Sequence, residues 1–276
     1  MSWHAHLQLD YRLEAARTVA RHEHNGPLRI LQSLYPEGDA VCHNVLVHPP
    51  GGLVGGDTLD LRVTAGQTAH GLITTPGATR FYRSSGEAAL QRTEITLSDQ
   101  ARLEWLPLEA IAYNDCRAEN RLSITLDAGA EFMGWDVTAF GLPNANLPFA
   151  RGSFLQHIEV PGVWLERGLI RADDERLMNG PLGLAGQRCL ASLFFVAGSA
   201  VAKERRQGAL DAARDVIAAH ALRPLAGVTS PCPQVVVVRV LAPLVEPAMD
   251  LLRQIRSVWR PHLWRLPANN PRIWTT

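Results

Sequence analysis

The feature that most constrains the fold is a series of short segments in which apolar and polar residues alternate. The segment 58–64 reads Thr-Leu-Asp-Leu-Arg-Val-Thr, which places Leu59, Leu61 and Val63 on one face and polar residues on the other. A period of two is typical of a half-buried β-strand. The same pattern recurs in segments 93–97, 121–126 and 154–160. From residue 7 to about 171 the sequence therefore predicts a sheet-rich architecture.

A weak internal repeat bears on how these strands are arranged. The segment 95–103 reads Ile-Thr-Leu-x3-Ala-x-Leu, and the segment 124–132 repeats it 29 residues later with Phe in the last place. An approximate third copy begins at Leu61 and Val63 with a different spacing. A strand, a tight turn of small residues and a second strand, repeated, would build a layered stack. An ordinary β-meander would give the same pattern, so the repeat alone leaves both arrangements open.

The last third of the chain combines two buried strands with two helices. The strands are expected at 189–196 and 234–241, because both segments are continuously apolar. The first helix is expected from Ser199, as its N-cap, to about residue 222. The second begins near Glu246 and should end at Pro261. No long polar linker interrupts the chain, so we expect one domain over 1–276, β-rich over 1–196 and strand–helix over 197–276.

The net charge of the chain bears on which classes of macromolecule it could bind. The chain of 276 residues carries 27 basic and 27 acidic side chains, so its formal net charge is zero. A neutral chain has no general electrostatic attraction for nucleic acid or for an anionic membrane, and we expect neither as a partner. Lys203 is the only lysine, and no phosphate-binding motif surrounds it.

The cysteines and the N-terminus indicate the compartment. The four cysteines lie far apart and form no Cys-x-x-Cys pair of a zinc or redox site. The N-terminal segment lacks the basic-then-apolar layout of a signal peptide. No apolar run approaches the roughly 20 residues that span a bilayer. We therefore expect a cytoplasmic protein.

The most distinctive segment runs from His48 to Asp57 and reads His-Pro-Pro-Gly-Gly-Leu-Val-Gly-Gly-Asp. It lacks the Gly-Lys-Ser/Thr of a phosphate loop, and a strand rather than a helix follows it. Asp57 is open to two interpretations: a carboxylate that contacts a metal transiently, or a cap for its own turn. Glycines in such a turn permit positive φ angles and close backbone approach. They are Gly51, Gly52, Gly55 and Gly56.

Other candidate ligands and catalytic groups are dispersed. Two His-x-His pairs, at 4–6 and 22–24, would each share one face of a strand, but no third ligand follows at a recognised spacing. The chain has neither a Gly-x-Ser-x-Gly elbow nor a recognisable catalytic cysteine context. Glu104 and Glu109 stand in apolar surroundings. A buried carboxylate is costly unless it is paired, so both are functional candidates unless they point to water.

The C-terminal tail interleaves arginine and tryptophan. This pattern could grip single-stranded nucleic acid, but the neutral charge of the chain disfavours that interpretation. The same two residue types are enriched at the hot spots of protein–protein interfaces, so we expect a partner surface. The candidate partner-binding residues are Arg256, Trp259, Arg260, Arg272 and Trp274.

An ordered set of motifs resembles the UreD family of urease accessory proteins, also called UreH. The similarity runs from about residue 6 to the C-terminus, and no single motif would suffice without the others. The motifs are Gly26–Arg29, Tyr35–Gly38, His48–Asp57, Thr74–Ser84, Leu103–Ile111 and Pro271–Trp274.

The resemblance implies a non-enzymatic maturation factor. Such a protein would bind UreF, recruit the GTPase UreG and sit on the urease apoprotein while nickel is delivered. The implied fold is mainly β, a β-helix-like stack of short strands with two C-terminal α-helices, which favours the stack over the meander. Its interior is expected to offer a path for transient nickel, with no tightly bound cofactor.

The resemblance also suggests residues for that path. The Gly-rich turn with His48 and Asp57 is the first candidate, either as part of the path or as a turn that sets its shape. The remaining candidates are Thr75, Tyr82, Glu104 and Glu109. The C-terminal helix and the residues up to Trp274 would face UreF.

Two points stand apart from this interpretation. The family commonly has Gly-Arg-x-Ala-x-Gly-Glu after its middle strands, whereas this chain reads Gly-Leu-Pro-Asn-Ala-Asn-Leu from residue 141. The Arg and the Glu are missing, so the resemblance leaves the role of the loop 141–149 open. The competing class of function is a β-rich, metal-dependent hydrolase that uses His48, Asp57 and Glu104.

Overall fold

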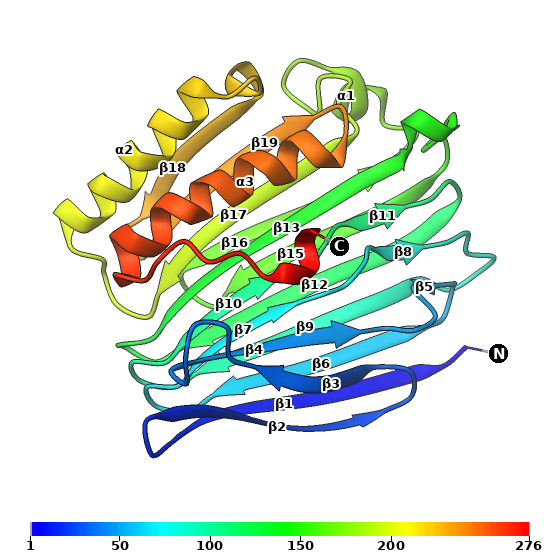
Figure 1. Ribbon diagram of the computed structural model, residues 1–276. Coiled ribbons are helices and arrows are strands. Elements are labelled where there is room, and N and C mark those ends of the chain that lie inside the picture. Colours follow the sequence, from blue (N-terminus) through cyan, green and yellow to red (C-terminus); the bar gives the residue numbers. More distant parts are fainter. Residues whose placement is uncertain (1, 276) are drawn as a thin grey trace.

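Two twisted sheets face each other, and within each sheet the strands of successive coils lie side by side (Figure 1). The computed structural model describes residues 2–275. The chain alternates between the sheets and forms a β-solenoid of about 4 turns. The predicted β-helix-like stack is confirmed. A meander is excluded, because strands of successive coils pair in parallel rather than antiparallel.

One sheet has seven strands and forms the outer wall of the solenoid. Its strands, in spatial order, are β16 (Trp164–Arg171), β15 (Gly152–Val160), β12 (Cys116–Leu126), β9 (Ala89–Leu97), β6 (Thr58–Ala65), β1 (His4–Glu14) and β2 (Arg17–Asn25).

The second sheet has twelve strands and forms the opposite wall. Its main path is β18 (Ala226–Cys232), β19 (Val235–Ala242), β17 (Cys189–Ala197), β13 (Glu131–Leu142), β10 (Arg102–Leu106), β7 (His70–Thr74), β4 (Val41–Val47) and β3 (Arg29–Leu34). Short strands extend it at one end: β5 (Gly52–Leu53), β8 (Thr79–Phe81), β11 (Ala110–Ala112) and β14 (Leu147–Pro148).

The sequence repeat is the register of the stack. Strand β12 lies on β9 with Ile124 opposite Ile95, so the two copies of the repeat occupy equivalent places in successive coils. The third copy is real but offset, because Val63 rather than Leu61 pairs with Ile95. Leu61 pairs with Thr93 instead.

The small residue of the repeat has a packing role at the corners of the solenoid. Ala69, Ala101 and Ala130 close tight turns and are almost completely buried. Each corner hydrogen-bonds to the next, since the amide of Arg102 donates to the carbonyl of Ala69 and the amide of Glu131 donates to that of Ala101. A larger side chain would meet the neighbouring corner, which explains why alanine recurs.

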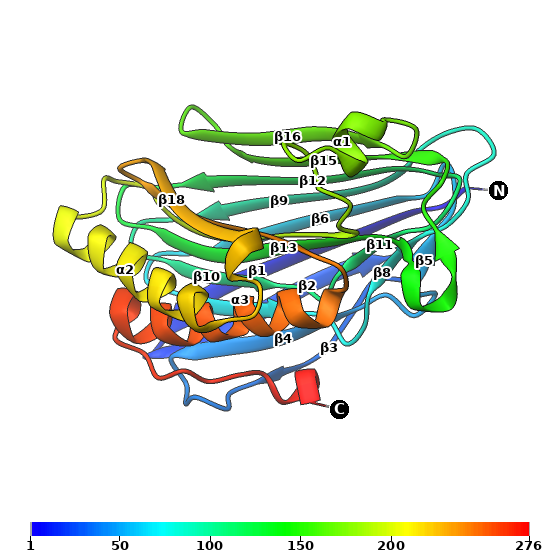
Figure 2. The ribbon, with the colours of Figure 1, turned by 90° about the horizontal axis from the view of Figure 1, so that it is seen from above.

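Two helices, α2 (Lys203–Ala219) and α3 (Val245–Trp259), pack on the outer face of the twelve-stranded sheet over β13, β17, β18 and β19 and make a third layer, whereas α1 (Glu175–Asn179) lies beside β16 (Figure 2). Short helical turns are Pro143–Ala145, Arg223–Leu225, the π-helical turn Arg260–Trp264 and Arg272–Thr275. No helix within residues 2–275 has both the length and the apolar character needed to cross a bilayer.

Both long helices were expected, but two of their boundaries differ. Helix α2 begins at Lys203 with Ala202 in the N-cap position, whereas the Ser199 hydroxyl donates to the carbonyl of Ala128. Ser199 therefore ties the helix approach to the β12–β13 corner and is not the cap. Pro261 does not end the helical backbone, because Trp259 and Arg260 keep helical angles and the chain continues as the π-helical turn Arg260–Trp264.

Candidate functional site

A row of amide side chains interrupts the apolar interior between the two sheets. Gln91 of β9, Asn120 of β12 and Gln156 of β15 occupy paired positions on three neighbouring strands. The Gln91 side-chain amide donates to Asn120 Oδ1 at 3.3 Å. Gln156 is buried, and Gln91 and Asn120 are half-buried. Amides shielded from water cost free energy unless they are hydrogen-bonded, so this row requires partners on the opposite wall.

Asp136 of β13 is that partner. Asn120 donates to its Oδ2 at 2.9 Å, and Gln156 donates to its Oδ1 at 2.5 Å. The hydroxyl of Thr138 lies 3.3 Å from the same Oδ1. All three donors are neutral, and Asp136 takes part in no ion pair within residues 2–275. A carboxylate that keeps only neutral partners in a buried site retains its capacity to accept a cation.

The surroundings of Asp136 also change its acidity. Burial raises the pKa of Asp136 to about 6, against the favourable hydrogen bonds from Gln156 and Thr138. The nearby negative charge of Glu166 raises it further. The carboxyl group therefore exchanges its proton close to neutral pH, which is typical of groups at functional sites.

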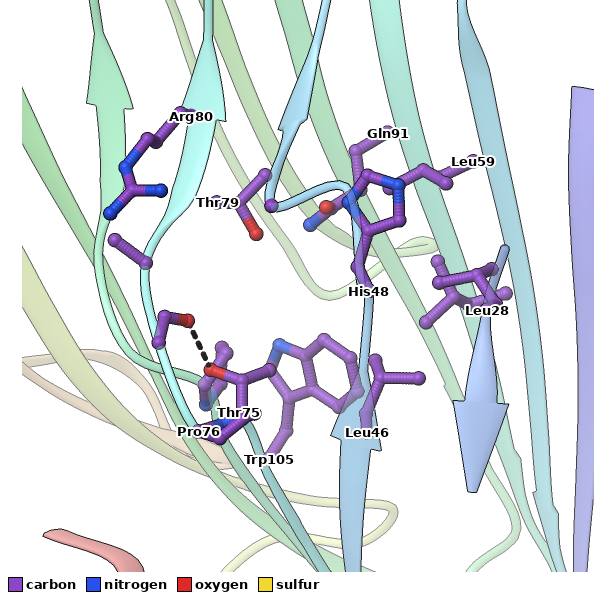
Figure 3. Close-up of a pocket in the computed structure, with 15 residues that line it drawn as sticks. Leu28, Leu46, His48, Leu59, Thr75, Pro76, Thr79, Arg80, Gln91 and Trp105 are labelled. Atoms are coloured by element: carbon purple, nitrogen blue, oxygen red, sulfur yellow. Dashed lines mark hydrogen bonds between the residues drawn. The ribbon is translucent and has the colours of Figure 1, made fainter. Parts of the chain in front are cut away.

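A cavity of about 140 Å³ opens beside the Gly-rich turn, between the two sheets. Figure 3 shows the side chains of His48, Thr79 and Gln91 turned toward this space, with Trp105 along its floor. Both ring nitrogens of His48 are buried and lack a hydrogen-bond partner among the described residues. Burial lowers the pKa of His48, and Asp57 opposes the shift only in part, so the imidazole is neutral at pH 7.

A second, smaller cavity of about 20 Å³ lies beside the first. The two share the walls formed by Thr79, Gln91 and Trp105. The smaller cavity reaches Asn120 and Asp136, and its volume suffices for about one water molecule. Polar side chains thus occur at intervals along two adjoining and mostly apolar cavities, from the neutral imidazole of His48 to the carboxyl group of Asp136.

The Gly-rich turn has the geometry of a capped turn. Asp57 is buried, and its carboxylate accepts the amide hydrogens of Trp3 at 3.2 Å and Val54 at 3.0 Å. Gly56 has a φ of +89°, in the region that favours glycine. A Cβ atom at Gly52 would lie 2.3 Å from the ring of Tyr82. The turn-capping interpretation of Asp57 fits these contacts, and both of its carboxylate oxygens are occupied by backbone amides.

The other predicted path residues lie in different places. Thr75 lines the larger cavity, where its hydroxyl accepts the Leu108 amide at 2.8 Å and donates to the Gly77 carbonyl at 3.0 Å. The remaining glycines Gly51 and Gly55 belong to the same turn, and only Gly51 lines the cavity.

Tyr82 and Glu109 do not line that cavity. Tyr82 packs on Gly52 and on the ring of Tyr113, whose centroid lies 4.9 Å away. Glu109 borders a separate cavity of about 210 Å³ between the loop 141–145 and the start of α3. A role of Tyr82 and Glu109 in a nickel path stays a prediction, and neither residue lines the cavity beside the Gly-rich turn.

Glu104 belongs to a buried ionic cluster, which we call the Glu104 cluster: Glu37, Glu104, Arg256 and Arg260. Its side chain is fully buried, and its oxygens lie 2.7 Å from Arg256 Nη2 and 3.1 Å from Arg260 Nε. Arg260 also contacts Glu37, with Nη1 2.7 Å from Oε2. Burial by itself would raise the pKa of Glu104, but Arg256, with His70 and Arg260, outweighs burial and holds that pKa well below its usual range.

This cluster corrects the expectation of a surface built from the C-terminal arginines and tryptophans. Arg256, Trp259 and Arg260 are completely buried, and Trp274 is 9% exposed. The Trp259 indole donates to the carbonyl of Ala209 at 2.9 Å, which fastens α3 to α2. The side chains therefore hold α3 on the solenoid and are not available as surface anchors in this structure. Arg272, in contrast, is exposed.

The Trp274 side chain has a similar internal role. Its indole donates to the Thr74 hydroxyl at 2.9 Å, and its ring lies 5.1 Å from that of Trp135. The segment after α3 thus returns to strands β7 and β13 of the twelve-stranded sheet (Figure 1). Partner binding by the tail stays a prediction. The buried tail residues cannot contact a partner directly in this structure.

No compact metal centre forms among the described residues 2–275. Within them, no group of three or more His, Cys, Asp or Glu side chains lies together in a way that could hold a metal ion. His4 contacts Asp60, and the rings of His22 and His24 stack with centroids 6.0 Å apart. His48, Asp57 and Glu104, the set required by the hydrolase alternative, are likewise not assembled into such a group.

Comparison with known proteins is consistent with this architecture. A family model described as UreD urease accessory protein matches residues 4–275. Urease accessory protein UreD from Variovorax paradoxus (strain S110) is 69% identical over 276 residues, with 100% of both chains covered. Its counterpart from Polaromonas naphthalenivorans (strain CJ2) is 70% identical over 275 residues, also with 100% of both covered.

A more distant relative extends the same result. Urease accessory protein UreD from Methylibium petroleiphilum (strain ATCC BAA-1232 / LMG 22953 / PM1) is 49% identical over 297 residues, with 100% of both chains covered. Proteins of this name are maturation factors and not enzymes, which confirms the expectation of a non-enzymatic protein. The chain therefore belongs to the UreD family of urease accessory proteins, and its role is in the maturation of urease.

Proposed function

We propose that this chain conducts nickel ions through its interior to the urease apoprotein, as a cytoplasmic scaffold on which UreF and the GTPase UreG assemble. The observation that supports the conduit is Asp136, a buried carboxyl group with only neutral donors, which borders the second of two adjoining cavities that begin at His48. The route we assign is His48, Thr79, Gln91, Asn120 and Asp136.

The chemistry of this route suits a metal in transit. Neutral imidazole is a good ligand for Ni²⁺, while hydroxyl and amide oxygens bind it weakly. Each position along the route offers one or two such ligand atoms. Tight binding would need three or four ligands at one position. An ion would therefore pass from His48 to Asp136 without being retained.

A steric plug tests the route. Thr79 lies in the wall shared by the two cavities, and a Thr79→Trp side chain would occupy much of the larger one, of about 140 Å³, and close the way to the smaller one. Urease subunits are co-expressed with UreF, UreG and either wild-type protein or the variant, and the nickel content of purified urease is measured. We expect the plug to reduce nickel toward the content obtained without this protein.

A matched control separates the plug from a general effect of tryptophan. Thr96→Trp places the same ring on the exposed outer face of β9, where it meets no cavity. It should leave the nickel content unchanged, and both variants should still copurify with UreF and the urease subunits. Wild-type nickel content with a folded Thr79→Trp variant would contradict the conduit. Failure of the wild-type protein to copurify with UreF and urease would contradict the scaffold.

A further inference from the structure

Polar side chains cross the inner face of the twelve-stranded sheet as well. Asp136 of β13, Ser192 of β17 and Arg239 of β19 stand opposite one another on three neighbouring strands. The inward positions on either side of Ser192 and Arg239 are apolar: Leu190, Phe194, Val237 and Leu241. Because alternate residues of a strand share one face, the three side chains form a polar row at one level of an otherwise apolar wall.

Glu166 of β16 joins this row at the end of the solenoid. It occupies an inward position between the buried Trp164 and Ile170. Its Oε1 accepts the Ser192 hydroxyl at 3.5 Å, and its Oε2 accepts a hydrogen bond from Arg239 Nε at 3.0 Å. Since β16 is the last strand of the seven-stranded sheet and β19 is next to last in the other, this ion pair bridges the two sheets at the end of the stack (Figure 1).

The row leads from Asp136 to solvent. Ser192 is completely buried, whereas the Glu166 side chain is 20% exposed and the Arg239 side chain is 44% exposed. The negative charge of Glu166 also raises the pKa of Asp136, so the two carboxyl groups interact. Polar side chains therefore continue beyond Asp136 and end at the Glu166–Arg239 ion pair.

The placement of this pair is costly for a purely structural contact. Ion pairs with this much exposure contribute little to stability, and apolar side chains at the same inward positions would avoid the desolvation of two charges. The pair does, however, control the charge at the end of the row. While Arg239 holds Glu166, the carboxylate is neutralised and the guanidinium group repels a cation that arrives from Asp136. Once Arg239 turns into solvent, Glu166 is an unpaired carboxylate at the end of the row.

We propose that the Glu166–Arg239 ion pair is the gate through which Ni²⁺ leaves the interior. This inference rests on the proposed conduit, whose assigned route ends at the buried Asp136. When Arg239 releases Glu166, the freed carboxylate takes the cation over from Asp136. Arg239 is the member that moves, because its side chain is the more exposed of the two. A guanidinium group at the end of a polar path excludes cations, so Ni²⁺ passes only while Arg239 is displaced.

The two members of the pair should give opposite results, which a purely structural ion pair would not. Arg239→Gln leaves the Glu166 carboxylate unpaired, so the purified full-length protein should bind Ni²⁺ about tenfold more tightly than wild type in equilibrium dialysis. Urease matured with this variant should keep at least its wild-type nickel content. Glu166→Gln removes the last carboxylate of the row, so the nickel content of urease matured with it should fall several-fold.

Arg62→Gln is the matched control, because it breaks an ion pair with Glu94 on the outer face of the seven-stranded sheet, away from the polar row. It should leave both Ni²⁺ binding and urease nickel unchanged, and all three variants should copurify with UreF and urease as the wild type does. Equal Ni²⁺ affinity of Arg239→Gln and Arg62→Gln would overturn the gate. An equal loss of urease nickel with Arg239→Gln and Glu166→Gln would overturn it too.

The Thr79→Trp plug separates failure of the gate from failure of the conduit. If the plug lowers urease nickel while Glu166→Gln leaves it at the wild-type content, the gate is wrong and the conduit stands. If the folded plug variant has no effect, the conduit is wrong, and the gate that rests on it is wrong as well.

Discussion

Glu104 and Asp136 are two buried carboxyl groups on neighbouring strands of one sheet, and their surroundings are opposite. Glu104, on β10, points toward the helices and meets the guanidinium groups of Arg256 and Arg260. Asp136, on β13, points between the sheets and meets only amides and a hydroxyl. Both are buried, yet their pKa values move in opposite directions.

This difference indicates which of the two buried carboxylates is free to bind a cation. The charge of Glu104 is already neutralised by protein cations, and those contacts tie α3 to the solenoid, which is a structural task. The pKa of Asp136 is raised by burial to about 6, so a bound metal ion would relieve an unfavourable charge there. Both carboxyl groups are buried in apolar surroundings, so burial does not distinguish them. Their hydrogen-bonding and ionic partners do.

The largest expected effect is on stability, from Glu104→Gln. The substitution leaves Arg256 buried without a counter-charge, while Arg260 keeps only Glu37, and it should lower the free energy of unfolding by about 3–5 kcal/mol. Chemical denaturation followed by circular dichroism measures it. Glu109→Gln is the matched control, since this partly exposed side chain lies outside the cluster, and it should change stability by less than about 0.5 kcal/mol. Equal loss in both variants would show that Glu104 has no special role.

A smaller effect on stability is expected from Asp136→Asn. The amide keeps one oxygen acceptor but turns a donor toward Asn120 or Gln156, while the energetic cost of a buried charge disappears. These changes oppose each other, so the free energy of unfolding at pH 7 should stay within about 1 kcal/mol of wild type. The same denaturation experiment applies. A loss as large as that of Glu104→Gln would mean that Asp136, too, is mainly a structural residue.

The pH dependence sharpens the contrast further. The folded-state pKa of Asp136 is raised from 3.8 to about 6, so this residue favours folding at acid pH, and that contribution is lost as the pH rises through 6. Between pH 5 and pH 7 the wild type should lose about 1 kcal/mol relative to Asp136→Asn. Glu104 has the opposite sign, because its lowered pKa favours folding at neutral pH and the contribution is lost only in strong acid. Parallel pH profiles for wild type and Asp136→Asn would contradict the raised pKa.

Much of the fold could be predicted from the sequence, because alternation and the 29-residue repeat follow directly from stacked strands. The 29-residue spacing also holds for Gln91 and Asn120, which precede the two copies of the repeat at equivalent positions and pair across β9 and β12. A polar side chain at an inward-facing strand position, such as Asn120, indicates the site better than the apolar positions around it.

The ionic partners could not be predicted in the same way. Glu104 and Arg256 are 152 residues apart, and only the return of α3 over the twelve-stranded sheet brings them together. The tail arginines and tryptophans therefore resembled a surface motif, although they are interior contacts. Asp136 was missed because the segment Glu131–Leu142 is almost wholly apolar and gives no local sign that its aspartate faces a polar row.

The central claim is that Asp136, rather than any other buried carboxylate, serves the passage of nickel. The most direct measurement is the nickel content per active site of urease matured in the presence of wild-type protein, Asp136→Asn or Asp136→Glu, with the accessory complex recovered in equal amounts. We predict a marked loss of nickel with Asp136→Asn and at least partial retention with Asp136→Glu, which keeps the carboxylate. Full nickel content with a stable, complex-forming Asp136→Asn variant would contradict the account.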